Sequence, residues 1–262
     1  MSLINPGSTV TAPPRVPALD RQTSSRLAAE ELARVGRLLT SLSPADWSRP
    51  TDCPGWDVRA LSTHLLGMAE MFSSFPRNAR QHLPAARAAK RGEVYIDALT
   101  ARQVADRSTL KPNEVVRQLA AAAPRNVRWR RKAPGVLRRR AMPDAQLVGQ
   151  GELAALETWT FGFLFDVILT RDAWMHRVDI ARATEKQLEL SPDHDGLLVA
   201  DVVAEWASRH DQPYDLTLTG PAGGSWSRGG HGPAMTVDAV DFCRALSGRG
   251  PAAGLLSVSV PF

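Results

Sequence analysis

The spacing of apolar residues changes once along this chain, near Thr184, and that change limits the folds open to it. Before Thr184, apolar residues recur every three or four positions in several long segments, which predicts amphipathic helices. After it, residues 214–219 (YDLTLT) alternate between apolar and polar, the period of a strand with one buried face. We therefore expect a mainly α protein, in which a helical part (21–185) is followed by a smaller α+β domain (186–262). Residues 1–20 are rich in proline and have neither period, so we expect them to form a disordered tail.

Five segments of the helical part carry the helical spacing. Asp57 is placed to cap the second of them, because an aspartate before the first apolar residue can accept hydrogen bonds from free backbone N–H groups. The last segment has no proline and one interior glycine, Gly162, so it predicts either one long helix or two helices joined near this glycine. The expected helices are 26–42, 58–72, 94–104, a helix that opens at Pro112, and 151–184.

The α+β part is expected to contain two helices and three strands. A glycine-rich segment, 220–232, follows the first strand and includes the possible second one. Thr236 is the candidate cap of the second helix, and Gly248 is placed to end it. The expected elements are a helix at 197–206, strands at 214–219 and 224–228, a helix at 237–246 and a last strand at 255–260.

The composition excludes several classes of protein. With 262 residues, the chain is long enough for two modest hydrophobic cores. No apolar run reaches the roughly 20 residues of a membrane-spanning helix, because Gly162 and Asp166 interrupt the best candidate, 161–169. The N-terminal residues lack the order of a secretion signal, and two cysteines far apart in the sequence make no disulfide framework. We therefore expect a cytoplasmic protein that does not associate with membranes.

The formal net charge of +5 comes from one segment. Residues 125–140 contain eight arginine or lysine residues and no acidic residue, whereas the rest of the chain has 24 basic and 27 acidic residues. Trp129 lies within the segment, and a basic, partly aromatic segment can contact phosphates and stack on bases. A non-enzymatic binder of an anionic partner is therefore one hypothesis. Pro134 and Gly135 split the segment, and no nucleic-acid-binding motif accompanies it, so nucleic acid is not the expected partner.

Asp172 and His176 are the first candidates for a functional site. Side chains four residues apart leave the same face of a helix one turn apart, so this pair can chelate one divalent ion. His64 is a third candidate ligand from another helix, and three such ligands leave the fourth position of zinc open, as in catalytic sites. The spacing also fits a simpler structure, in which Asp172 and His176 form a surface ion pair and His64 is a hydrogen-bonded core histidine.

Two sequence motifs resemble signatures of the mycothiol-dependent maleylpyruvate isomerase family, within the DinB-like superfamily. The first comprises Trp47, Thr51, 53–59 (CPGWDVR), Leu61 and 64–67 (HLLG). The second is 172–183 (DAWMHRVDIARA). The motifs agree with the family in order and spacing, and the resemblance extends over about residues 22 to 260. It implies a DinB-like four-helix bundle followed by a smaller α+β domain.

The resemblance also implies a metal and its ligands. Family members hold a divalent metal, usually zinc, with a histidine from the first motif and a carboxylate and a histidine from the second. In this chain these positions are His64, Asp172 and His176. The best-studied members have glutamate where this chain has the shorter Asp172, so a different ion or a degenerate, non-catalytic site is kept as an alternative.

Family members use the metal to bind the sulfur of mycothiol, a low-molecular-weight thiol. A metal ion deprotonates a bound thiol at neutral pH, and the thiolate can add to an activated double bond. Expulsion after rotation gives cis-trans isomerisation, whereas retention of the sulfur gives S-transfer. The resemblance therefore implies an enzyme that acts on a small electrophile with mycothiol as cofactor or co-substrate. The choice between the two outcomes, the substrate and the oligomeric state are left open.

The candidate catalytic residue is Arg249. Residues 246–249 (LSGR) resemble a family motif whose arginine takes part in catalysis, where a cation would stabilise developing negative charge. The simpler explanation is an exposed charge just past a helix end. Arg228, in the glycine-rich segment, is a weaker candidate, and both Cys53 and Cys243 are expected to be buried small residues without a role in the mechanism.

Asp179 lies one turn after His176 on the same expected helix. One possible role is to orient this histidine from behind the metal. The alternative, which we expect, is an ion pair with Arg177 or Arg182.

Overall fold

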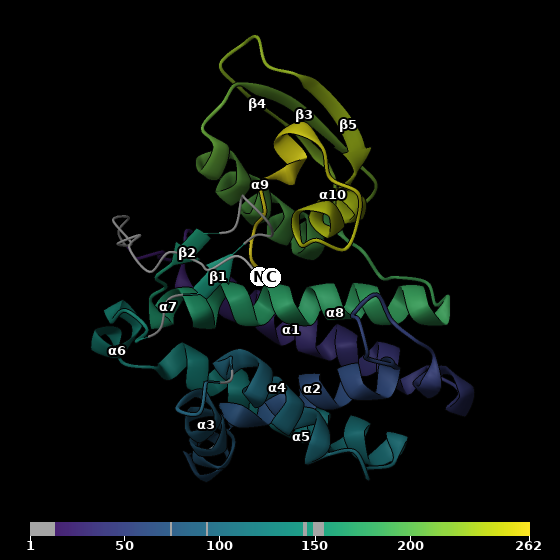
Figure 1. The fold of residues 1–262 in the computed structure, drawn as a ribbon. Helices are drawn as coiled ribbons and strands as arrows, with labels where there is room; N and C mark the ends of the chain where they lie inside the picture. Colours follow the sequence, from purple (N-terminus) through teal and green to yellow (C-terminus); the bar gives the residue numbers. More distant parts are fainter. Residues whose placement is uncertain (1–13, 74, 93, 144–145, 149–154) are drawn as a thin grey trace.

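The structure is a computed structural model that describes residues 14–73, 75–92, 94–143, 146–148 and 155–262. Residues 1–13 of the predicted tail are therefore outside the described part. The described chain is mainly helical with a small sheet towards its C-terminal end, as the sequence predicts (Figure 1). The sheet and its helices lie on one side of helix α8 (Leu169–Thr184), and the other long helices lie on the opposite side. No described helix is both long enough and apolar enough to cross a membrane.

A bundle is formed by the helices α1 (Arg21–Thr40), α2 (Val58–Met71), α5 (Pro112–Lys132) and α8. Helices α1 and α2 both pack against α5, and both also contact α8. Asp20 and Asp57 begin α1 and α2 by accepting hydrogen bonds from backbone N–H groups of the first turn, so the predicted cap at Asp57 is confirmed. Apolar side chains from all four helices share one core, among them Leu61, Val115 and Ile180.

The connection from α2 to α5 is also helical. Helices α3 (Phe75–Ala89) and α4 (Tyr95–Ala105) pack against each other, and each contacts α2. Helix α4 confirms the prediction at 94–104. The sequence pattern did not predict α3, whose segment is rich in alanine and arginine.

The predicted helix 151–184 is wrong in its first part. The chain forms a strand there, and helical structure begins only at Phe161, where the hydroxyl of Thr160 accepts a hydrogen bond from a first-turn N–H. Pairing with a partner strand overrides the helical spacing, because the spacing within a segment does not report its distant partners. Residues 151–154 lie outside the described part. The observed elements are antiparallel strands β1 (Gln146–Val148) and β2 (Ala155–Glu157), then α7 (Phe161–Phe163), a π-helical turn (Leu164–Ile168) and α8.

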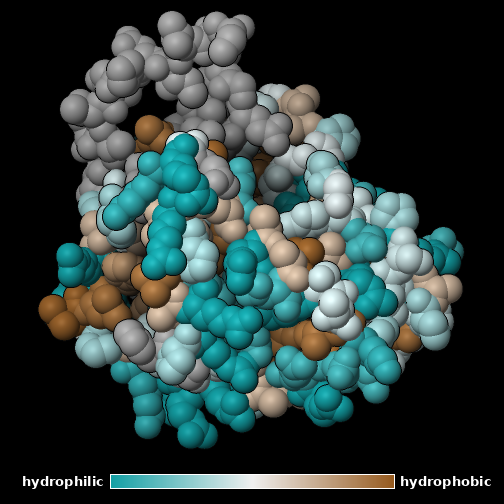
Figure 2. Space-filling model, turned by 60° about the horizontal axis from the view of Figure 1, so that its bottom comes forward, coloured by the Kyte–Doolittle hydropathy of each residue, from teal (hydrophilic) through white to brown (hydrophobic). Residues whose placement is uncertain are grey.

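The basic segment 125–140 belongs partly to the interior. Helix α5 extends through its first half and α6 (Gly135–Arg139) through its second, so it is helical and not a separate stretch. Arg130 is buried, where burial lowers its pKa to about 10, and its Nε donates to the backbone oxygen of Phe165 at 2.7 Å. Arg138 is buried in an ion pair with Asp166. Arg130 and Arg138, two of the eight basic residues of the segment, therefore connect helices. This leaves six basic residues of the segment for contact with an anionic partner. The side of the molecule turned forward in Figure 2, the lower side of Figure 1, is mostly hydrophilic, with apolar residues in separate patches.

The α+β part has a sheet in the order β4-β3-β5. Strand β3 pairs antiparallel with β4 and parallel with β5, and its alternate residues are buried, which confirms the two strands predicted at 214–219 and 224–228. Trp206, Leu216 and Phe242 share the core between the sheet and its helices. The elements are α9 (Leu197–His210), β3 (Tyr214–Thr219), β4 (Gly224–Arg228), β5 (Ala234–Asp238) and α10 (Ala239–Leu246).

Two predictions in this part are wrong. Thr236 lies inside β5, and Asp238 caps α10 by accepting hydrogen bonds from two backbone N–H groups of its first turn. Both residue types suit a helix start, but pairing with β3 forms a strand here, β5, that the sequence pattern did not predict. Residues 254–257 form a 3₁₀ turn and not part of a strand at 255–260, and their apolar side chains pack on the core.

Helix α8 contributes to both hydrophobic cores. Trp174, Met175 and Val178 pack with the α+β part, whereas Ala173 and Ile180 pack with the bundle. The domain boundary after residue 185 stays a prediction. Because one helix serves both cores, it also fixes how side chains from the two parts approach each other.

A network of buried charges joins α1, α8 and the segment before α9. Arg177 donates to both carboxylate oxygens of Glu31, at 2.6 and 3.1 Å, and to Oδ1 of Asp195 at 2.7 Å. All three side chains are almost completely buried. Burial opposes the charge of Arg177, yet the two carboxylates raise its pKa. Each charge in the network therefore depends on its partners, since an unpaired buried charge is costly.

Candidate active site

His64, Asp172 and His176 meet between α2 and α8. His64 Nε2 lies 3.6 Å from Asp172 Oδ2, and His176 Nε2 lies 3.3 Å from Asp172 Oδ1. The two imidazole rings are perpendicular, with their centroids 5.2 Å apart. Both histidines are buried, and Asp172 is partly exposed. The structure thus brings together the three residues named from the sequence, with one nitrogen or oxygen atom of each within 4.8 Å of the others.

A chain of hydrogen bonds fixes the orientation of His64. The amide nitrogen of Gln81 donates to the backbone oxygen of Gly67, and its oxygen accepts from the amide nitrogen of Gln103. Gln103 therefore presents its oxygen to Nδ1 of His64, at 2.8 Å. Because this oxygen can only accept, Nδ1 carries a hydrogen, and the lone pair of the neutral ring is on Nε2, facing Asp172. The sequence pattern identified neither glutamine.

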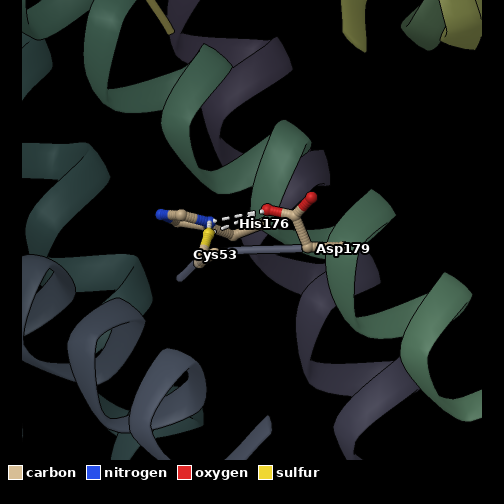
Figure 3. Close-up of side chains that lie close together, drawn as sticks. All are labelled: Cys53, His176 and Asp179. Atoms are coloured by element: carbon tan, nitrogen blue, oxygen red, sulfur yellow. Dashed lines mark hydrogen bonds and ion pairs between the residues drawn. The ribbon is translucent and has the colours of Figure 1, made fainter. Parts of the chain in front are cut away.

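His176 is held in the same way by residues behind it (Figure 3). Its Nδ1 lies 3.2 Å from Oδ2 of Asp179, one turn further along α8, and 3.8 Å from Sγ of Cys53. Asp179 is completely buried, and its carboxylate accepts the Nδ1 hydrogen. The lone pair of a neutral His176 is then on Nε2, which faces Asp172.

Acceptor atoms from three residues thus point at one another, an arrangement that is unfavourable unless a positive charge lies between them. Burial opposes the charged form of Asp172, yet His176 and His64 hold its pKa far below the usual range. Burial likewise opposes the charge of His176, yet Asp172 and Asp179 raise its pKa well above the usual value. We call His64, Asp172 and His176 the trio. A proton on His176, or a divalent ion bound by the trio, supplies the positive charge. The separations of 3.3 and 3.6 Å are close to the distance of about 3.3 Å between ligands bound tetrahedrally to zinc, so the residues fit a metal ion.

Arg249 reaches this site from the end of α10. Gly248, with φ of +78°, turns the chain, and the N–H of Arg249 donates back to the carbonyl oxygen of Arg244. The guanidinium of Arg249 donates to Oδ2 of Asp179 at 3.1 Å and to Sγ of Cys53 at 3.5 Å. Burial opposes its charge, but Asp179 and Cys53 raise the pKa of Arg249. Arg249 is therefore a partly buried cation next to the trio, and not an exposed charge at a helix end.

Two residues of this site differ from their sequence-based predictions. The ion pair expected for Asp179 is wrong, because Arg177 and Arg182 pair with other carboxylates. Cys53 is half-buried, and its sulfur lies 3.4 Å from Oδ2 of Asp179, so it belongs to the site. Cys243 is completely buried, as predicted. The place of Cys53 within the first motif was the one signal in the sequence that pointed to it.

A cavity of about 920 Å³ opens beside the trio. Its wall includes His64, Asp172 and His176 together with Arg249 and Trp56. The ring of Trp56 lies 5.2 Å from that of His64, between centroids. The bundle and the C-terminal part both contribute to the wall, and its volume falls in the range of small-molecule binding sites.

Residues 28–181 match a family model described as the mycothiol maleylpyruvate isomerase N-terminal domain, and this is more than half of the chain. The chain belongs to the mycothiol maleylpyruvate isomerase family. The matched region of this family member includes His64, Asp172 and His176, and also Cys53 and Asp179 behind them.

Two crystal structures are similar in fold to this mycothiol maleylpyruvate isomerase family member. One is of the mycothiol-dependent maleylpyruvate isomerase, with 18% sequence identity, and the other is of a histidine-to-alanine mutant of that enzyme, with 17%. Both have a TM-score of 0.54, and both comparisons cover 88% of this chain and 90% of the other. At this identity the likeness concerns the fold, and it extends beyond the bundle into the α+β part. No curated protein matches the chain in sequence.

Proposed function

We propose that this protein is a divalent-metal-dependent enzyme that activates a low-molecular-weight thiol, mycothiol, for reaction with a small electrophile. The observation that carries the proposal is the convergence of His64, Asp172 and His176 on the wall of one cavity, with the acceptor atoms of both histidines held from behind. Zinc is the expected ion, since two imidazoles and one carboxylate leave its fourth position for sulfur.

The residues around the trio have separable roles in this proposal. A divalent ion bound there would lower the pKa of a thiol ligand, which makes the thiolate available at neutral pH. Asp172 contributes the one negative charge among the three ligands. Gln103 and Asp179 keep the two histidines in the tautomer that leaves Nε2 free, and such partners raise the basicity of a ligand histidine.

Arg249 contributes a positive charge to the wall of the same cavity. Addition of a thiolate to an activated double bond moves negative charge onto the acceptor, and a partly buried guanidinium stabilises that charge. Asp179 and Cys53 hold the guanidinium in place before an acceptor arrives. Expulsion of the thiolate after rotation gives the isomer, whereas uptake of a proton by the acceptor gives a thioether. The site suits either outcome.

Turnover of electrophiles by the zinc-loaded protein tests this function. We expect mass spectrometry to detect isomers or thiol adducts that form only when mycothiol is present, in a panel that includes maleylpyruvate and maleate esters. The Arg249→Met variant should form them at least about 10-fold more slowly, because it lacks the cation. The matched control is Arg228→Met, since Arg228 pairs with Asp211 at the surface of the α+β part. The absence of any mycothiol-dependent product, or an Arg249→Met rate equal to that of the wild type, would contradict the proposal.

A further inference from the structure

The cavity extends away from the trio as an apolar arm. Met68 on α2 and Phe72 at its C-terminal cap follow His64 at intervals of four residues, and all three line the cavity. Phe165 and Leu169 line it from the segment that leads into the metal-binding face of α8. Eight residues of α-helix span about 12 Å, so the arm reaches well beyond the position of a metal-bound sulfur.

Aromatic rings form the far wall of this arm. The ring of Trp129 lies 5.1 Å from that of Phe72 and 5.2 Å from that of Phe165, between centroids. Phe72 and Phe165 are themselves 5.4 Å apart in an edge-to-face arrangement. Leu99 and Leu137 add aliphatic surface. Side chains of this kind offer a flat apolar group large contact areas and no charged partner.

Positive charge is scarce in the cavity. Among the described residues that line it, Arg249 is the only arginine or lysine. The undescribed residues cannot supply another, because the sequence has neither lysine nor arginine at 1–13, 74, 93, 144–145 and 149–154. His82 lines the cavity, but burial lowers its pKa, which keeps the ring neutral at pH 7. A second carboxylate on a substrate would therefore lie in the arm without a cation, at a large desolvation cost.

We propose that the thiol acceptor is an apolar electrophile, preferably an aromatic one, that carries at most one negative charge. Its reactive, polar end lies near Arg249, and its apolar group fills the arm lined by Phe72, Trp129 and Phe165. The assignment of the reactive end rests on the proposed function, whereas recognition by the arm does not. A small dicarboxylate such as maleylpyruvate would leave most of the arm unfilled, and its second carboxylate would have no cation there.

Binding of non-reactive succinate derivatives to the zinc-loaded protein tests this proposal without thiol or turnover. Succinate, monobenzyl succinate and dibenzyl succinate share one backbone and differ in charge and apolar size. We expect both benzyl esters to bind at least about 100-fold more tightly than succinate by calorimetry, because each buries an aromatic ring. Equal or tighter binding of succinate would overturn the proposal.

Two variants locate the binding of the benzyl group. Trp129→Ala should weaken the binding of monobenzyl succinate about 10-fold and leave the binding of succinate unchanged. Its control is Val136→Ala, since Val136 is 75% exposed on the neighbouring α6 and is not among the residues of the wall. Unchanged binding of monobenzyl succinate to a folded Trp129→Ala variant would overturn the proposal.

If Trp129→Ala does not fold, succinate binding to the Thr100→Lys variant tests the proposal instead. Thr100 is a partly exposed residue of α4 in the cavity wall, and lysine suits a helix, so this variant adds the missing cation at little structural cost. The variant should bind succinate at least about 10-fold more tightly than the wild type, through a charge-assisted contact. Unchanged succinate binding would overturn the proposal. Turnover is a separate readout: benzyl-ester binding without any mycothiol-dependent product from monobenzyl maleate contradicts the proposed function alone.

Discussion

At limiting zinc, the thiol-dependent turnover of the Asp172→Asn variant is expected to be more than about 100-fold slower than that of the wild type. Asp172 lies between the two histidines, 3.6 Å from His64 Nε2 and 3.3 Å from His176 Nε2, and is the only carboxylate of the trio. Loss of a residue that merely supports a metal ligand costs about 10–100-fold in affinity or activity, so loss of the anionic ligand should cost more. The initial rate of product formation from mycothiol and an electrophile measures the effect.

The Asp172→Glu variant is the matched control for this prediction. It keeps the carboxylate and lengthens the side chain by one methylene, and glutamate is the residue that the family resemblance places at this position. We expect its turnover to stay within about 10-fold of the wild type, since either carboxylate can ligate the ion. Thermal unfolding midpoints close to that of the wild type would show that both variants are folded. Wild-type turnover in Asp172→Asn would remove Asp172 from the mechanism.

The Arg177→Met variant is expected to have a free energy of unfolding about 3–5 kcal/mol below that of the wild type. The substitution keeps an unbranched apolar stem but removes the guanidinium that pairs with Glu31 and Asp195, both of which are completely buried. Two carboxylates would then remain in the interior with fewer partners. Denaturant titration followed by circular dichroism measures the loss.

Arg182→Met, on the same helix, is the control for the stability measurement. Arg182 is 51% exposed and pairs with Asp52 at 3.2 Å, so its replacement should cost less than about 1 kcal/mol. Similar losses for the two variants would mean that burial of the Arg177 network does not stabilise the junction between α1, α8 and the segment before α9.

Most of the fold could be predicted from the sequence, because most helices and strands bury one face. The spacing of apolar residues on that face identifies the element. The strand at 214–219 was predicted because apolar residues alternate with polar ones there. The apolar residues Tyr214, Leu216 and Leu218 are indeed the buried ones. The hairpin of β1 and β2 was missed, because its pairing depends on residues outside the segment that shows helical spacing. The same limit applies to β5, which was not predicted because it pairs with β3; the cap of the next helix is therefore Asp238 and not Thr236.

The trio was predictable, whereas the residues that support it were less so. Asp172 and His176 are four residues apart on one helix, and the first motif added His64. Gln103 is 39 residues from His64 and lies on another helix, and no periodicity links the two. The approach of Arg249 to Asp179 depends on how the α+β part packs on α8, which only the tertiary structure shows.

The metal content of the purified protein, measured by elemental analysis without chelator in the buffers, tests the central claim most directly. We predict about one divalent ion per chain for the wild type and for His82→Ala, which removes a histidine from the same cavity but not from the trio. His64→Ala should retain less than about a tenth of that content, because one of the three ligands is lost. Equal metal content in the wild type and His64→Ala would contradict the account.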